Sequence, residues 1–62
     1  MRSIELLKFF KYDHLPENLK EISKPFGDLA YAMNGVLPEN QEKLFALRKL
    51  LEAKDCAVRA VL

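Results

Sequence analysis

Apolar residues recur at helical spacing in the part of the chain that follows Leu15-Pro16-Glu17-Asn18. They stand three and four residues apart, which predicts a long helix over residues 16–35 with one buried stripe. The members of this stripe are Leu19, Ile22, Phe26, Leu29, Met33 and Val36. Asn34 and Gly35 both tolerate the left-handed conformation of a C-terminal cap, so we expect the helix to close there. Pro25 interrupts the backbone hydrogen bonding of such a helix, which predicts a kink or a break near Ser23 and Lys24.

The same four residues return as Leu37-Pro38-Glu39-Asn40 and predict a second long helix over residues 38–62. Only a short connection separates the two helices, so they must be antiparallel neighbours. Residues 1–14 fit neither a regular helix nor a regular strand, and we expect a short N-terminal helix or an extended arm. The whole chain, residues 1–62, is therefore predicted to be a single all-α domain built on an antiparallel helical hairpin.

The second helix carries more apolar surface than a two-helix hairpin can bury. Leu44, Leu47, Leu51 and Val58 form one stripe, which can face the first helix. A second stripe of mostly small residues comprises Ala46, Leu50, Ala53, Ala57 and Ala60. Small residues let helices approach closely, so this stripe is a candidate interface in a homo-oligomer. The alternative is that the N-terminal arm folds over it within one chain.

Chain length favours assembly over the monomeric alternative. A chain of 62 residues buries only about 60% of its surface on folding, so its core is marginal. Cys56 is the only cysteine, which excludes a disulfide within the chain and a usual four-ligand zinc site. We therefore expect no metal and no cofactor, and a partner subunit as the remaining source of stability.

Charge and hydropathy exclude several classes of partner. Ten Lys and Arg against nine Asp and Glu give a formal charge of +1, with both signs mixed along the chain. A duplex DNA binder usually carries a strong basic excess, so neither DNA binding nor a helix-turn-helix regulator is favoured. No apolar run is long enough to span a membrane, and a cytoplasmic protein is predicted. On the second helix, Arg48 with Glu52 and Asp55 with Arg59 are expected to pair at i to i+4.

The sequence contains no motif that points to catalysis, so we expect a protein that is not an enzyme. His14 stands alone, and Cys56 lies in mid-helix, where a buried, unreactive thiol is the usual outcome. The remaining candidate is the aromatic stretch 9–14, which also carries Lys11. Set just ahead of a helix N-terminus, it could stack a nucleotide base and hold a phosphate, or it could supply core and rim residues. Spacing alone does not separate these two interpretations.

A longer pattern suggests a family. It comprises Phe10-x-Tyr12-x-His14-x-Pro16, Ile22, Leu29-Ala30, Pro38, Glu42, Ala46-Leu47-x-Lys49-Leu50-x-Glu52-Ala53 and an Ala-rich end. It resembles the phage anti-CBASS cyclic-nucleotide sponge family and the related hairpin domain of an anti-Thoeris sponge. The resemblance extends over about residues 10–60. It implies a helical homohexamer, a dimer of trimers, that works in the cytoplasm of the infected host cell.

The same resemblance implies a function and a set of residues. The protein would bind and sequester cyclic di- or trinucleotide immune signals without cleaving them, and so suppress CBASS-type antiphage defence. Tyr12 would stack on a base, with His14 and Pro16 shaping the same wall. The chain departs from the family at two positions where many members carry basic residues. These positions are Ser23 and Gly27, and the basic residues available instead are Lys11, Lys20 and Lys24.

A different class of function is compatible with the same sequence. The chain could be a small oligomeric interaction module that binds a host protein through an exposed apolar arm. Nucleotide binding by the purified protein would separate the two hypotheses.

Overall fold

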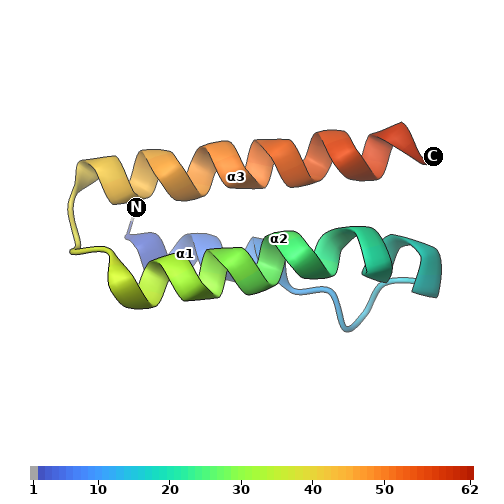
Figure 1. The fold of residues 1–62 in the computed structure, drawn as a ribbon, viewed down its shortest axis with the longest axis horizontal. Coiled ribbons are helices and arrows are strands. Elements are labelled where there is room, and N and C mark those ends of the chain that lie inside the picture. The colour runs from blue at the N-terminus through green and yellow to red at the C-terminus, as the bar shows by residue number, and fades with distance from the viewer. Residues whose placement is uncertain (1) are drawn as a thin grey trace.

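Two long antiparallel helices form a hairpin, and a short N-terminal segment packs against both of them (Figure 1). The computed structural model describes residues 2–62. Its elements are α1 (Ser3–Leu7), the 3₁₀ helix η1 (Lys8–Phe10), α2 (Glu17–Val36) and α3 (Gln41–Ala60). The prediction of an all-α hairpin is confirmed, and of the two alternatives for residues 1–14 the structure shows the short N-terminal helix.

The two Leu-Pro-Glu-Asn segments start their helices in different ways. Pro16 directly precedes α2, whereas α3 begins only at Gln41, three residues later than predicted from Pro38. There the side chain of Asn40 caps the helix, because its Oδ1 accepts a hydrogen bond of 2.9 Å from the Lys43 N–H. In the second copy the proline and the glutamate therefore belong to the connection, and the asparagine is the capping residue.

The end of α2 differs from the expected left-handed cap. The helix continues through Gly35 to Val36, and no residue among 2–62 has a positive φ. Leu37 is extended, with φ −88° and ψ 139°, and its N–H donates to the Met33 carbonyl at 3.0 Å. Because a proline disfavours the helical conformation of the residue before it, Pro38 accounts for the end of the helix.

Pro25 does not break α2, which runs without interruption through this residue. Both Pro25 and Glu21 are exposed. Water can therefore hydrate the Glu21 carbonyl, which has no N–H partner at Pro25. The exposed position of the proline explains why the expected break is absent.

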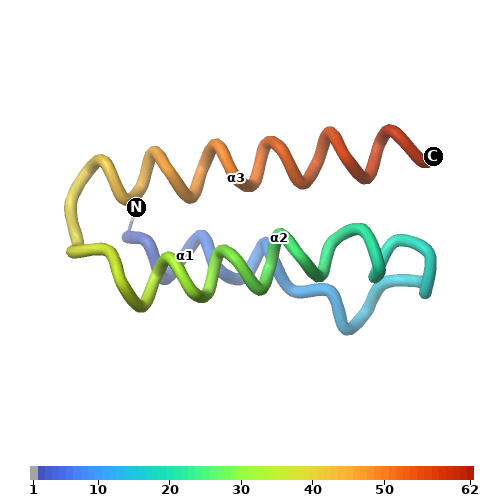
Figure 2. The backbone as a smooth tube through the Cα atoms, viewed as in Figure 1, coloured from blue at the N-terminus to red at the C-terminus, as the bar shows by residue number. Residues whose placement is uncertain are grey.

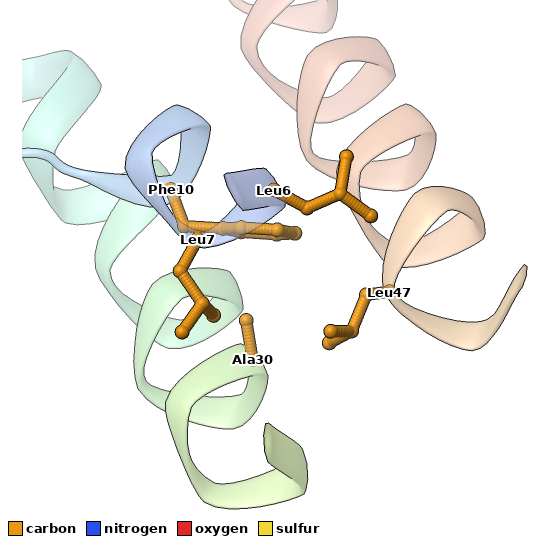
Figure 3. Packing of buried hydrophobic residues seen from close by; sticks show 5 residues of the cluster. All are labelled: Leu6, Leu7, Phe10, Ala30 and Leu47. Atoms are coloured by element: carbon orange, nitrogen blue, oxygen red, sulfur yellow. The ribbon is translucent and has the colours of Figure 1, made fainter. Parts of the chain in front are cut away.

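The core lies where the N-terminal segment meets the hairpin (Figure 3). Leu6, Leu7 and Phe10 come from this segment and bury their side chains against Ala30 of α2 and Leu47 of α3. The stripe predicted for α2 is only partly inside: Phe26 and Met33 pack half-buried against this core, but the buried residues of the helix are Ser23, Gly27 and Ala30. Leu29 and Val36, both expected inside, remain 47% and 70% exposed. The N-terminal segment covers one flank of α2, and this shifts the buried face toward small residues.

Polar contacts hold the N-terminal segment at both ends. At its start, the Ser3 hydroxyl and N–H donate to Glu39 Oε2 at 3.0 and 3.3 Å. The buried Lys43 pairs with Glu39 Oε1 at 3.3 Å and donates to the Asn34 carbonyl at 2.9 Å. At the other end, Lys54 Nζ donates to the Phe9 carbonyl at 2.7 Å. The chain then loops round to the start of α2 (Figure 2).

Candidate functional site

Tyr12 is fixed at the point where the N-terminal segment crosses α2. Its carbonyl accepts a hydrogen bond of 3.1 Å from the Leu15 N–H, which closes a turn over residues 12–15. Its ring lies against Gly27, where an added Cβ would be 2.8 Å from the Phe10 carbonyl oxygen and 3.3 Å from the Tyr12 Cδ1. Only a residue without a side chain allows this close approach. The Tyr12 ring is therefore supported by the backbone of α2 and remains half-exposed.

A hydrogen bond orients the phenol of Tyr12. The hydroxyl donates to Asp28 Oδ1 at 3.3 Å. Partial burial raises the pKa of Tyr12 above its usual 10.0, and the charge of Asp28 and this hydrogen bond raise it further. Smaller contributions to the raised pKa come from Asp13 and Tyr31. The phenol is thus protonated and acts as a donor at neutral pH.

Two of the basic residues predicted for the site lie on the same face of α2 as this contact. Lys20, Lys24, Gly27 and Tyr31 follow one another at spacings of four, three and four residues, which places them on one side of the helix. Lys24 is exposed, whereas Lys20 is half-buried and pairs with Glu17 at 3.9 Å. Lys11 and His14 are exposed on either side of Tyr12 in the chain. The fold thus brings Tyr12 to the helix face that carries Lys20 and Lys24.

Ser23 and Gly27, the two positions that depart from the sponge pattern, face inward. Both are buried, and the Ser23 hydroxyl has no hydrogen-bond partner among the described residues. A long basic side chain at Gly27 would collide with the backbone at Phe10. Lys24, which lies three residues before Gly27 on the same side of the helix, is the exposed basic residue closest in sequence to these two positions.

Sequence reasoning missed three contributors to this surface: Gly27 as a support, Asp28 as a hydrogen-bond acceptor, and Tyr31. Tyr31 is 47% exposed. Helical spacing from Lys24 would have placed all three on one face, but only the path of the N-terminal segment shows that Tyr12 joins them. We call Tyr12, Lys20, Lys24, Asp28 and Tyr31 the tyrosine face.

The stripe predicted as a subunit interface remains largely uncovered. Ala46, Ala53 and Ala60 are exposed, while Leu50 and Ala57 are half-buried. The N-terminal segment does pack over the hairpin, as the monomeric alternative expected, but it leaves these three alanines free. An interface along this stripe stays a prediction.

Several expectations for the outer side of α3 are wrong. Cys56 is exposed instead of buried, and its Sγ accepts a hydrogen bond of 3.3 Å from Arg59 Nη2. The ion pairs in the described part of the chain include neither Arg48 with Glu52 nor Asp55 with Arg59, and Asp55 pairs with Lys54 at 3.6 Å instead.

A shallow hollow of about 220 Å³ is lined by Phe45, Arg48, Lys49 and Glu52, all on α3 itself.

Within residues 2–62, no group of three or more His, Cys, Asp or Glu side chains is placed to hold a metal ion. None of the helices described is both long enough and apolar enough to cross a membrane. The tyrosine face is therefore the candidate site with the most specific geometry.

Comparisons with protein families, with characterised proteins and with solved structures find no match to this chain.

Proposed function

We propose that this protein binds and sequesters cyclic di- or trinucleotide immune signals without cleaving them, as a phage-type sponge against CBASS defence. The observation that supports this proposal is the placement of Tyr12. Its ring is held against Gly27 and oriented by Asp28, on the helix face that carries Lys20 and Lys24. A supported aromatic ring offers a stacking platform to a base, and nearby ammonium groups offer charge to phosphates.

The proposal includes a homo-oligomer, in which a second chain completes the binding pocket. The tyrosine face of one chain is an open surface, and a small nucleotide is usually held in a cleft that buries most of it. A second chain that packs along the exposed alanines Ala46, Ala53 and Ala60 would supply stability and could bring a further wall to the site. A hexamer is the assembly that the sponge resemblance implies.

Titration calorimetry with a panel of cyclic di- and trinucleotides tests the proposal. Tyr12→Ala should weaken binding by roughly 1–3 kcal/mol, because it removes the stacking surface. Phe45→Ala is the matched control, since Phe45 is an aromatic residue of α3 with 43% exposure outside the tyrosine face. The control should bind like the unmodified protein.

Ligand recovered after denaturation should be intact, since sequestration involves no cleavage. Absence of both binding heat and thermal stabilisation across the whole panel would contradict the proposal. Equal loss of affinity in the Tyr12 and Phe45 variants would remove Tyr12 from the site.

A second candidate function is an interaction module that binds a host protein. The N-terminal segment cannot be the free apolar arm expected for it, because Leu6, Leu7 and Phe10 are buried. The exposed side chains of Leu29 and Val36 on α2 favour this function instead. Recovery of one stoichiometric host protein by purified protein that binds no nucleotide would support it.

A further inference from the structure

Asp28 has an unused hydrogen-bonding capacity at the edge of the tyrosine face. Its Oδ1 accepts the hydrogen bond from the Tyr12 hydroxyl at 3.3 Å. Among residues 2–62, no other side-chain hydrogen bond and no ion pair involves Asp28, although Lys24 lies one helical turn earlier. The side chain is also exposed. An ionised carboxylate has about four acceptor positions, so most of those on Asp28 face solvent.

The position of Asp28 relative to the ring decides what it can contact. Because the carboxylate bonds the phenol oxygen, it lies at the hydroxyl end of the Tyr12 ring. A purine is larger than a phenol ring, so a purine stacked on Tyr12 extends beyond the ring edge. When it extends past the hydroxyl end, its hydrogen-bonding edge comes within reach of the carboxylate.

The chemistry of that edge differs between the two purines. Guanine presents two adjacent donors, N1–H and the 2-amino group, and a carboxylate can accept both. Adenine presents an unprotonated N1, an acceptor that is repelled by a carboxylate, beside its 6-amino group, so it offers only one donor where guanine offers two. Hydrogen bonds to a charged group are stronger than neutral ones, so the difference between the bases is large.

We infer that Asp28 selects guanine over adenine in the base that stacks on Tyr12. This inference rests on the proposed nucleotide-binding function and adds a specificity-determining residue to it. Asp28 then has two roles, since one oxygen orients the phenol and the remaining acceptor positions read the base.

The test measures the affinities of three matched ligands: cyclic diguanylate, cyclic di-inosinate and cyclic diadenylate. Inosine keeps the N1–H of guanine and lacks the 2-amino group. The unmodified protein should bind cyclic diguanylate roughly 10- to 100-fold more tightly than cyclic diadenylate, with cyclic di-inosinate between them. Asp28→Asn should abolish this preference, because an amide oxygen replaces the charged acceptor and an amide NH₂ faces the guanine donors.

Tyr12→Phe is the control that separates the two roles of Asp28. It removes the phenol hydroxyl while keeping the ring and the carboxylate, so the preference for guanine should persist. Thermal melts should show that both variants are folded.

Equal affinities for the three ligands in the unmodified protein would overturn the inference and leave the sponge proposal intact. The same holds if Asp28→Asn changes all three affinities by one common factor. Absence of binding by every ligand would overturn the inference together with the proposed function.

Discussion

Gly27 shows how one residue can support a candidate site without offering a side chain to a ligand. It lies in the middle of α2, where glycine lowers helix stability by about 1 kcal/mol relative to alanine. A glycine fits this position because the Phe10 carbonyl and the Tyr12 ring occupy the space that a side chain would need. Gly35 is in the same helix and has no atom within 4 Å of a built Cβ. A side chain at Gly27 would therefore affect both helix propensity and close packing, whereas a side chain at Gly35 would affect helix propensity alone.

We predict opposite effects of alanine at these two glycines. Gly27→Ala should destabilise the protein by about 1–3 kcal/mol, because overpacking against the Phe10 backbone outweighs the gain in helix propensity. Gly35→Ala should stabilise it by about 0.5–1 kcal/mol, since it gains helix propensity without a clash. Urea denaturation measures both changes. A Gly27→Ala variant as stable as the Gly35→Ala variant would show that the N-terminal segment does not pack closely on α2.

At the scale of elements, the connection between α2 and α3 also holds the start of α1. Glu39 lies in this connection, and its carboxylate accepts two hydrogen bonds from Ser3 while it pairs with Lys43. The backbone hydrogen bond from Ser3, followed by the one from its hydroxyl, lowers the pKa of Glu39 below its usual 4.5, with a smaller contribution from Lys43. The ionised carboxylate thus links the N-terminal segment to the turn of the hairpin.

This link should make stability depend on pH in the acidic range. Because the pKa of Glu39 is lower in the folded protein than in the unfolded chain, where it is near 4.5, its charge stabilises the fold at any pH above 4.5. This stabilisation is lost as the pH falls through the pKa of the folded protein. We expect Glu39→Gln to have a lower Tm than the unmodified protein at neutral pH, with the difference closing as the pH falls below about 4.5.

Thermal melts from pH 7 to pH 2.5 measure this difference for Glu39→Gln. Glu52→Gln is the control, because Glu52 is exposed on α3 and has no ion pair among the described residues. A difference for Glu39→Gln that is constant with pH would contradict the role given to its charge.

At the scale of the whole molecule, the fold has a small apolar core and leaves apolar side chains exposed on both long helices. Five apolar side chains are buried: Leu6, Leu7, Phe10, Ala30 and Leu47. The α2 residues Leu29 and Val36 are exposed, and so are three alanines on α3, so each long helix has its own uncovered apolar face. A marginal core with uncovered apolar faces is typical of a chain that assembles.

We predict an oligomer whose interface follows the alanines of α3. Native mass spectrometry should give a multiple of the 7.2 kDa chain mass, and Ala53→Arg should lower that multiple. Ala32→Arg places the same side chain on the exposed face of α2, next to Leu29 and Val36, and should leave the mass unchanged. The reverse pattern would assign the interface to α2, and a single-chain mass for the unmodified protein would contradict assembly.

The sequence by itself determined the two long helices and their order. Periodicity and proline positions act within a few residues, so these helices and their antiparallel arrangement followed from local spacing, whereas residues 1–14 left a short helix and an extended arm open. The short connection predicted between them left the two helices no other arrangement than a hairpin; in the structure this connection is residues 37–40. The same reasoning placed Lys20 and Lys24 on one helix.

Only the tertiary structure decided which faces are buried and what meets at the candidate site. The N-terminal segment is short and irregular in sequence, yet it supplies Leu6, Leu7 and Phe10 to the core and rotates the buried face of α2 toward Ser23, Gly27 and Ala30. This packing brings Tyr12 to Asp28, a contact between residues 16 positions apart. No periodicity encodes such a contact, because it depends on how one segment crosses another, and that is decided by burial of side chains distant in the sequence.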